Sequence, residues 1–248
     1  MELRPGLNRI GNDIVACYLV SDESGLTLID AGIPGQWNDF LAELTAMGRS
    51  IEDVRGVVLT HGDSDHIGFA ERLRRDHGVP VYVQEHDAAR ARGEVKASAS
   101  WGGMRIGATA RFLWYAALHG GLKPVYLTEV MPIEAGVTLP LPGSPVIVPM
   151  PGHSPGSIAV HVPAVDALFV GDALTTRNVL TGVEGPAPAP FTDDPAEALE
   201  VLDHIAGLKA TWVLPGHGAP WSGGVDEAVR RVRAAAANAA GSGDTKAA

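Results

Sequence analysis

Apolar residues form short runs in the first third of the chain, and their spacing alternates between strand and helix patterns. Two β-prone runs, residues 14–20 and 25–29, flank a polar turn, which predicts a hairpin. Apolar residues then recur at helical spacing over residues 37–47, which predicts a helix. Apart from Arg55 and Gly56, the run 54–59 is apolar, which is typical of a strand buried on both faces.

Helices and strands continue to alternate, which predicts an α/β fold. Residues 67–77 and 85–92 are expected to be helical, with a strand at 79–83 between them. Further strands are predicted at 146–150, 157–162, 167–170 and 211–214, and further helices at 194–206 and from 225 to about 237. Asp193 or Asp194 is expected to cap the first of these helices, and Pro186 to Pro190 to form a loop.

The stretch 93–130 differs from its surroundings. It opens with small residues and glycine and continues with large apolar ones, among them Trp101, Met104, Phe112 and Trp114. We interpret it as a helical insertion, or lid, within a single domain that covers residues 1–240. Residues 241–248 are small or polar and are expected to be a frayed tail.

Composition limits the class of partner. The chain has 248 residues and a net charge of −10, so nucleic acid and anionic membrane are poor candidates. The single cysteine, Cys17, lies in a predicted strand and is expected to be buried and inert. No apolar run is long enough for a membrane span, and no secretory signal is visible, so a cytoplasmic location is expected. The oligomeric state stays open, a homodimer included.

One segment concentrates residues that bind metals. His61, Asp63, Asp65 and His66 lie within six positions, where the buried strand 54–59 gives way to a helix. Such a site lies at the carboxyl edge of the strands, where α/β sheets collect ligands. A solvated turn does not require this density of histidine and aspartate, so the segment indicates a metal site.

Three later residues repeat this placement. His153, Asp172 and His217 each follow a predicted strand and lie next to a glycine. With the first four they make seven candidate ligands, enough for two divalent cations that share a bridging carboxylate. Asp30 is interpreted as a turn or cap residue. The other five histidines are not expected to be ligands: His77, His86, His119, His161 and His204.

These motifs resemble the metallo-β-lactamase superfamily, in its glyoxalase-II-like branch, whose pattern is Thr-His-x-His-x-Asp-His followed by a later His, an Asp and a His. The segments 28–32, 151–156 and 215–218 also resemble family motifs. The resemblance covers most of the chain. It implies an αββα sandwich, in which two mixed β-sheets lie face to face, helices flank them, and two metals lie at one edge.

The resemblance also implies roles for the candidate ligands. His61 and His153 would bind the first metal, and Asp172 would bridge the two. The second metal would be bound by three residues: Asp65, His66 and His217. Asp63 stands where the commonest pattern has histidine. It either binds the first metal, which then favours iron or manganese more than a zinc site does, or leaves that site weak or empty.

The resulting hypothesis is a hydrolase in which a metal-bound hydroxide cleaves an ester, thioester or lactone of a small acyl substrate. Two zinc ions are the first expectation for the metals. Asp65 would orient the hydroxide and pass on its proton, and Tyr115 is a candidate donor to the oxyanion. The aromatic residues of 93–130 suit an apolar acyl group. Three basic residues could meet a carboxylate: Arg105, Arg111 and Lys123.

Three other classes of function compete with this hypothesis. The segment 152–156 matches the nucleophile elbow of serine hydrolases, but Pro155 lacks the N–H that the oxyanion would need. Di-iron redox members of the superfamily carry an acidic residue at the position of Asp63, together with a flavin domain for which this chain has no room. A metal-bound sensor without catalysis is the third alternative.

Overall fold

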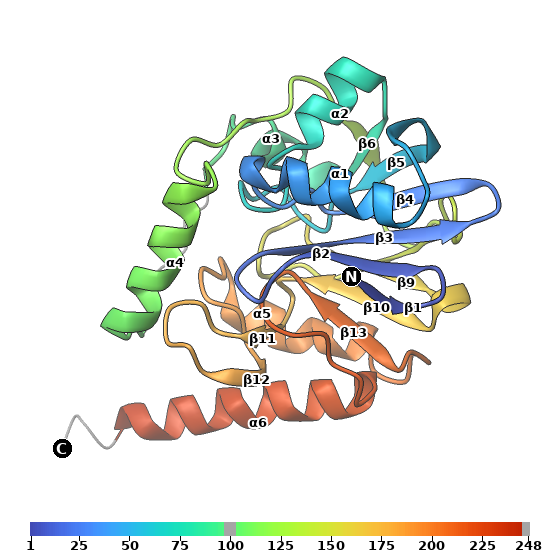
Figure 1. Ribbon diagram of the computed structural model, residues 1–248. Coiled ribbons are helices and arrows are strands. Elements are labelled where there is room, and N and C mark those ends of the chain that lie inside the picture. Colours follow the sequence, from blue (N-terminus) through green and yellow to red (C-terminus); the bar gives the residue numbers. More distant parts are fainter. Residues whose placement is uncertain (97–102, 245–248) are drawn as a thin grey trace.

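Two β-sheets lie face to face in the centre of the molecule (Figure 1). The computed structural model describes residues 1–96 and 103–244. The first sheet has the strand order β1-β2-β3-β4-β5-β6-β7. Its strands are Glu2–Arg4, Leu7–Gly11, Ala16–Asp22, Gly25–Ile29, Val54–Val58, Val81–Gln84 and Met131–Ile133. Pairing is antiparallel from β1 to β4 and parallel from β4 to β7, so the sheet is mixed.

The second sheet is smaller and has the order β13-β10-β9-β8. Its strands are Trp212–Pro215, Ala167–Gly171, Ile158–Val162 and Val146–Pro149. β10 pairs parallel with β13 and antiparallel with β9, so this sheet is mixed as well. A separate two-stranded ribbon joins β11 (Thr175–Arg177) to β12 (Glu184–Ala187).

Helices flank both sheets (Figure 1). The helices α1 (Trp37–Ala46), α2 (Ala70–His77) and α3 (Ala88–Ala91) lie on the side of the first sheet. The helices α5 (Pro195–Glu200) and α6 (Val225–Asp244) lie on the side of the second, and α4 (Ile106–Leu118) stands at one end of the sandwich. Short 3-10 turns lie at Pro34–Gln36, Ile51–Asp53, Glu85–Asp87, Pro163–Val165 and Val201–His204.

Apolar side chains fill three layers. Tyr18 and Val58 of the first sheet meet Phe169 and Leu214 of the second. A second layer joins the other face of the first sheet to α1 and α2, and it includes the fully buried Cys17, as predicted. A third layer joins the second sheet to α6. This order of layers confirms the predicted αββα sandwich.

Several elements differ from the prediction. The strands β1 and β2 were not expected, and α2 begins at Ala70 because residues 61–69 form the loop that carries the metal-binding motif. Pro186 and Ala187 lie in β12, so the predicted loop from Pro186 to Pro190 is wrong at its first two residues and right for 188–190. Proline is tolerated there because β12 belongs to a ribbon of two edge strands. The carboxylate of Asp194 caps α5, which confirms one of the two expected caps.

The C-terminal helix α6 runs to Asp244, further than the predicted end near residue 237. Residues 241–244 are therefore helical, and 245–248 lie outside the described residues. Within 93–130 the structure has α4, as a helical insertion requires, whereas Trp101 lies outside the described residues. The division into one domain with a lid stays a prediction. None of the described helices has the length and apolar character needed to cross a bilayer.

Candidate metal centre

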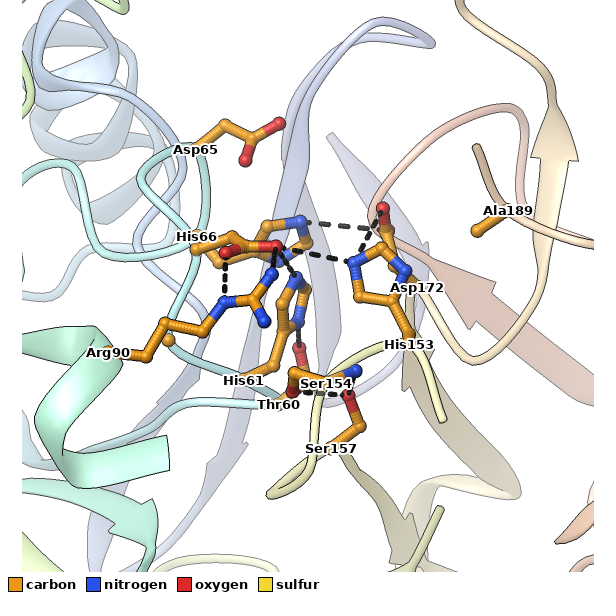
Figure 2. A network of polar contacts seen from close by, with 12 residues as sticks. Thr60, His61, Asp65, His66, Arg90, His153, Ser154, Ser157, Asp172 and Ala189 are labelled. Carbon is orange, nitrogen blue, oxygen red and sulfur yellow. Dashed lines mark hydrogen bonds and ion pairs between the residues drawn. The ribbon is translucent and has the colours of Figure 1, made fainter. Parts of the chain in front are cut away.

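The seven residues predicted as metal ligands come together at one edge of the two sheets. His61 and Asp63 lie in the loop after β5, and the turn at Asp65 and His66 follows at once. His153 comes after β8, Asp172 directly after β10, and His217 after β13. Figure 2 shows His61 and His66 between Arg90 on one side and His153 and Asp172 on the other.

Three of these residues form what we call the first group: His61, Asp63 and His153. One nitrogen or oxygen of each lies within 4.8 Å of the others, as a shared metal ion requires. The Nε2 atom of His153 is 3.3 Å from Asp63 Oδ2, and the Nε2 atom of His61 is 3.6 Å from the same oxygen. The carboxylate of Asp63 therefore faces both histidines, although sequence alone left its role open.

The second group consists of Asp65, His66 and His217, whose donor atoms meet the same criterion. The Nε2 atom of His217 is 3.4 Å from Asp65 Oδ2. Asp172 lies between the two groups: its Oδ2 is 3.1 Å from His217 Nε2 and 3.9 Å from His153 Nε2. Its other oxygen is 3.6 Å from His66 Nε2. This is the position that a bridging carboxylate needs.

Buried polar atoms at the centre lack protein partners. Among the described residues, His61 Nε2, His66 Nε2 and Asp172 Oδ1 are buried and make no hydrogen bond. Such groups are costly to leave unsatisfied, and a bound cation would satisfy all three. Gly216 leaves room for this approach, because a Cβ there would collide with His66 Cε1 and lie 2.8 Å from Asp172 Oδ1. The residues fit divalent metal ions.

The outer nitrogens of the histidines are held by acceptors. The Nδ1 atom of His66 is 2.8 Å from Asp30 Oδ2, and that of His217 contacts the carbonyl oxygen of Ile14. Thr60 Oγ1 donates to Asp30 at 2.8 Å, so it accepts from His61 Nδ1 at 3.0 Å. Each Nδ1 therefore keeps its proton when a metal binds, and Nε2 is the nitrogen that faces the metal.

His153 follows the same rule more weakly. Its Nδ1 atom is 3.3 Å from Thr192 Oγ1, and this hydroxyl donates to the carbonyl oxygen of Ala189 at 2.9 Å. The hydroxyl is therefore the acceptor for His153. All four histidines thus present Nε2 to the centre, as metal ligands do.

Asp30 corrects a sequence interpretation. It lies in a turn with a positive φ of 58°, but it is more than a turn residue. Its carboxylate is buried, accepts from the backbone N–H of Thr60 at 2.7 Å, and orients His66. The signal was its position: Asp30 directly follows β4, at the same edge as the ligands.

Asp87 is a second residue that the sequence did not reveal. It is fully buried and accepts hydrogen bonds from Gly62 N at 2.7 Å, Ser154 Oγ at 2.7 Å and Gly156 N at 2.8 Å. It thereby ties the loop that carries His61 to the loop that carries His153. Ser154 is fully buried and bonded to this carboxylate, which contradicts a serine nucleophile at this position.

Burial and neighbouring charges shift the ionisation of these groups. Burial acts to lower the pKa of His66, but the charge and hydrogen bond of Asp30 raise it to about 9. Burial acts to raise the pKa of Asp65, whereas the hydrogen bond from His217 lowers it to about 2. Burial, followed by the charges of His66 and His153, holds the pKa of His61 well below its usual range. In the metal-free protein, His66 of the second group is therefore protonated at neutral pH, whereas His61 of the first group is neutral.

An apolar cavity of about 370 Å³ opens beside the two groups. Asp63, Ser64, Asp65 and Tyr115 are among its lining residues. Its other lining residues include Val15, Ile33, Phe112, Leu113, Leu122 and Phe191. Among the described residues that line it, none is basic.

The remaining candidates lie apart from the metal centre. The three basic residues considered as carboxylate partners are exposed: Arg105, Arg111 and Lys123. In the part of the chain that the structure describes, none of the five other histidines belongs to a metal-binding group.

Comparison with known proteins agrees with this geometry. The sequence model of the metallo-beta-lactamase superfamily matches residues 10–217. The Bacillus subtilis (strain 168) protein named "Probable metallo-hydrolase YflN" is 28% identical over 241 residues, which cover 90% of this chain and 87% of that protein.

Solved structures have the same fold. The metallo-beta-lactamase family protein TTHA1429 from Thermus thermophilus superposes with a TM-score of 0.67 at 22% identity, over 93% of this chain and 79% of that one. TTHA1623, solved in a di-iron-bound form, gives a TM-score of 0.59 at 26% identity, over 87% of this chain and 93% of that one.

The chain belongs to the metallo-β-lactamase superfamily. The family and the His/Asp cluster together support a metal-dependent hydrolase that uses divalent metal.

Proposed function

We propose that the protein is a binuclear metal-dependent hydrolase that cleaves an ester, thioester or lactone of a small acyl substrate. The observation that carries the proposal is that the first and second groups lie side by side, with Asp172 between them and an apolar cavity next to them. A pair of divalent ions, zinc first, would supply an activated water and a Lewis acid for a carbonyl oxygen.

The chain's own residues supply position and proton transfer. Asp65 lines the cavity and is ionised well below neutral pH, with a pKa of about 2. It can therefore orient a water molecule by accepting its hydrogen bond, take up the proton that the water loses on attack, and pass that proton to the leaving group. The apolar lining can accept the acyl chain. Tyr115 belongs to the same lining and stays our candidate donor to the developing oxyanion.

The lining of the cavity favours the apolar part of an acyl substrate. Apart from Asp63, Ser64 and Asp65, its described lining is almost entirely apolar or aromatic. Divalent ions bound by the two groups would outweigh the charges of Asp63 and Asp65, so these carboxylates do not by themselves exclude an anionic substrate. The proposed class, an ester, thioester or lactone, follows from the apolar lining and the metal centre together.

The test is a panel of chromogenic neutral esters, thioesters, lactones, phosphodiesters and β-lactams. We expect hydrolysis of the neutral acyl substrates, loss of activity after chelation, and recovery with zinc. Asp65→Asn should lower kcat strongly, whereas His86→Ala, which changes an exposed histidine outside both groups, should not. Activity that ignores the chelator would contradict the proposal. Iron in protein purified without added metal, with oxygen consumption, would favour the redox alternative.

A further inference from the structure

Arg90 is a buried cation next to the first group. Its side chain is 6% exposed and its Nε donates to Asp63 Oδ1, while its Nη2 donates to Asp63 Oδ2 at 2.8 Å. A guanidinium and a carboxylate match in shape, so this is a two-point contact that fixes Asp63. Figure 2 shows Arg90 reaching the centre from the side of α3. Both oxygens of Asp63 are therefore already engaged by a positive charge.

Asp193 holds Arg90 from the other side. Its Oδ2 accepts from Arg90 Nη1 at 2.6 Å, and Nη1 lies across the guanidinium from the Nε–Nη2 edge that meets Asp63. The negative charge of Asp193 is therefore more distant from the first group than the positive charge of Arg90. Asp193 fixes the arginine without cancelling its effect on Asp63.

In the second group, the charged residue behind a ligand has the opposite sign. An anion, Asp30, lies behind His66, and its hydrogen bond makes the Nε2 atom of that histidine a stronger donor to metal. A cation lies behind the carboxylate of the first group. The two groups contain similar ligands. Asp30 adds negative charge next to the second group, whereas Arg90 adds positive charge next to the first.

We propose that Arg90 is a positioning residue that weakens the first group as a metal site, so that the protein binds two ions with unequal affinity. The guanidinium fixes Asp63 Oδ2 towards His61 and His153, but it also neutralises the carboxylate and repels an incoming cation. The second group fills first, and the ion in the first group exchanges more readily. The inference rests on the proposed function, because it concerns the same two ions.

Zinc binding in competition with a chromogenic chelator, at one alkaline pH where protons compete little, measures both affinities. We expect the first equivalent of zinc to bind at least about tenfold more tightly than the second. His153→Ala should remove the weaker phase, because His153 belongs to the first group alone. His217→Ala should remove the tighter phase for the matching reason.

The decisive variant is Arg90→Gln combined with Asp193→Asn, which removes one charge of each sign and leaves Asp63 available to metal. We expect the weaker phase to tighten by about tenfold or more, and the tighter phase to stay unchanged. Arg90→Lys keeps the positive charge but not the fork, so a smaller change in the same direction is expected if the double variant does not fold. Arg74→Gln is the matched control, since Arg74 makes a two-point contact with Glu71 away from the centre.

Two equivalents of equal affinity in the wild-type protein would overturn the inference. So would a weaker phase that His217→Ala removes, or one that the Arg90 variants leave unchanged or weaken. Absence of zinc binding in the wild-type protein would instead overturn the proposed function, so the two failures are distinguishable. Visible spectra of the cobalt-substituted proteins give a second readout that does not depend on catalysis.

Discussion

The first and second groups each combine histidine nitrogens with one carboxylate, and they share Asp172. The residues behind them differ. His61 and His153 rest on the neutral hydroxyls of Thr60 and Thr192, and Asp63 rests on the cation Arg90. In the second group, His66 rests on the carboxylate of Asp30.

Under the proposed two-metal arrangement, the residues behind the ligands set the properties of each metal position together with the ligands themselves. Hydrogen bonds to charged groups are stronger than bonds between neutral groups. The second group is therefore better prepared for a cation, and the first is better prepared for an ion that must leave or exchange. Each prediction below tests one part of this contrast.

The largest loss of metal binding and activity should come from removing Asp172 or His66. Asp172→Ala takes away the carboxylate that both groups share, and we expect it to abolish binding of at least one ion and lower activity more than about a hundredfold. His66→Ala should also lose metal and activity together. Elemental analysis and hydrolysis rates measure both outcomes. Full activity of either variant in a metal-free preparation would refute the two-ion arrangement.

The two groups should also differ in their dependence on pH. Metal entering the second group must displace the proton of His66, whose pKa is raised to about 9. Its apparent affinity should therefore rise about tenfold per pH unit for each proton displaced, from neutral pH to about 9. His61, whose pKa is lowered, is already neutral and adds no such dependence. Chelator competition across this range should show the gap between the phases widening.

The stability of the metal-free protein should depend on pH in the opposite direction to metal affinity. Because folding raises the pKa of His66 from 6.5 to about 9, its charged pair with Asp30 contributes fully below 6.5. The contribution is lost as the pH rises through about 9. Thermal unfolding of the metal-free protein should therefore show Tm falling over this interval, and Asp30→Asn should flatten the fall. A Tm that rises there would contradict the assignment.

The ligands could be predicted from sequence because their signal is local. Histidine and aspartate after strand ends, beside glycines, mark one edge of an α/β sheet whatever the detailed packing. The residues behind the ligands give no such signal. Arg90 is 27 residues from Asp63 and 103 from Asp193, so its role appears only when helix α3 packs against two loops that are distant in the sequence.

The same limit explains the strands that were missed. The strand β2 contains Asn8 and Arg9, which are polar yet buried. Their burial is made favourable by distant partners, since Asn8 donates to Glu43 and Arg9 donates to the carbonyl oxygen of Gly218. A pattern of apolar residues cannot show this compensation. The parallel core strands β4, β5 and β6, by contrast, are rich in buried apolar residues and were predicted.

Asp30→Asn replaces the charged acceptor of His66 by a neutral one, and it should lower zinc affinity less than loss of Asp172 or His66 does. We expect zinc at the second group to bind about 10- to 100-fold more weakly, with the first group unchanged. Chelator competition on the His153→Ala background isolates the second group for this measurement. Asp22→Asn, at an exposed turn away from the centre, is the control. If zinc affinity fell only at the first group, the assignment of Asp30 to the second group would be wrong.

The smallest effect should come from Thr192→Val. Its hydroxyl is a neutral acceptor 3.3 Å from His153 Nδ1, so its loss removes a weak orienting contact and no charge. We expect affinity at the first group to fall by less than about threefold, since a neutral hydrogen bond contributes little net free energy. Thr45→Val, which removes an exposed hydroxyl on α1, serves as the control. If Thr192→Val instead cost as much as Asp30→Asn, the charge behind a ligand would not be what separates the two groups, and the contrast would have to be sought in the ligands themselves.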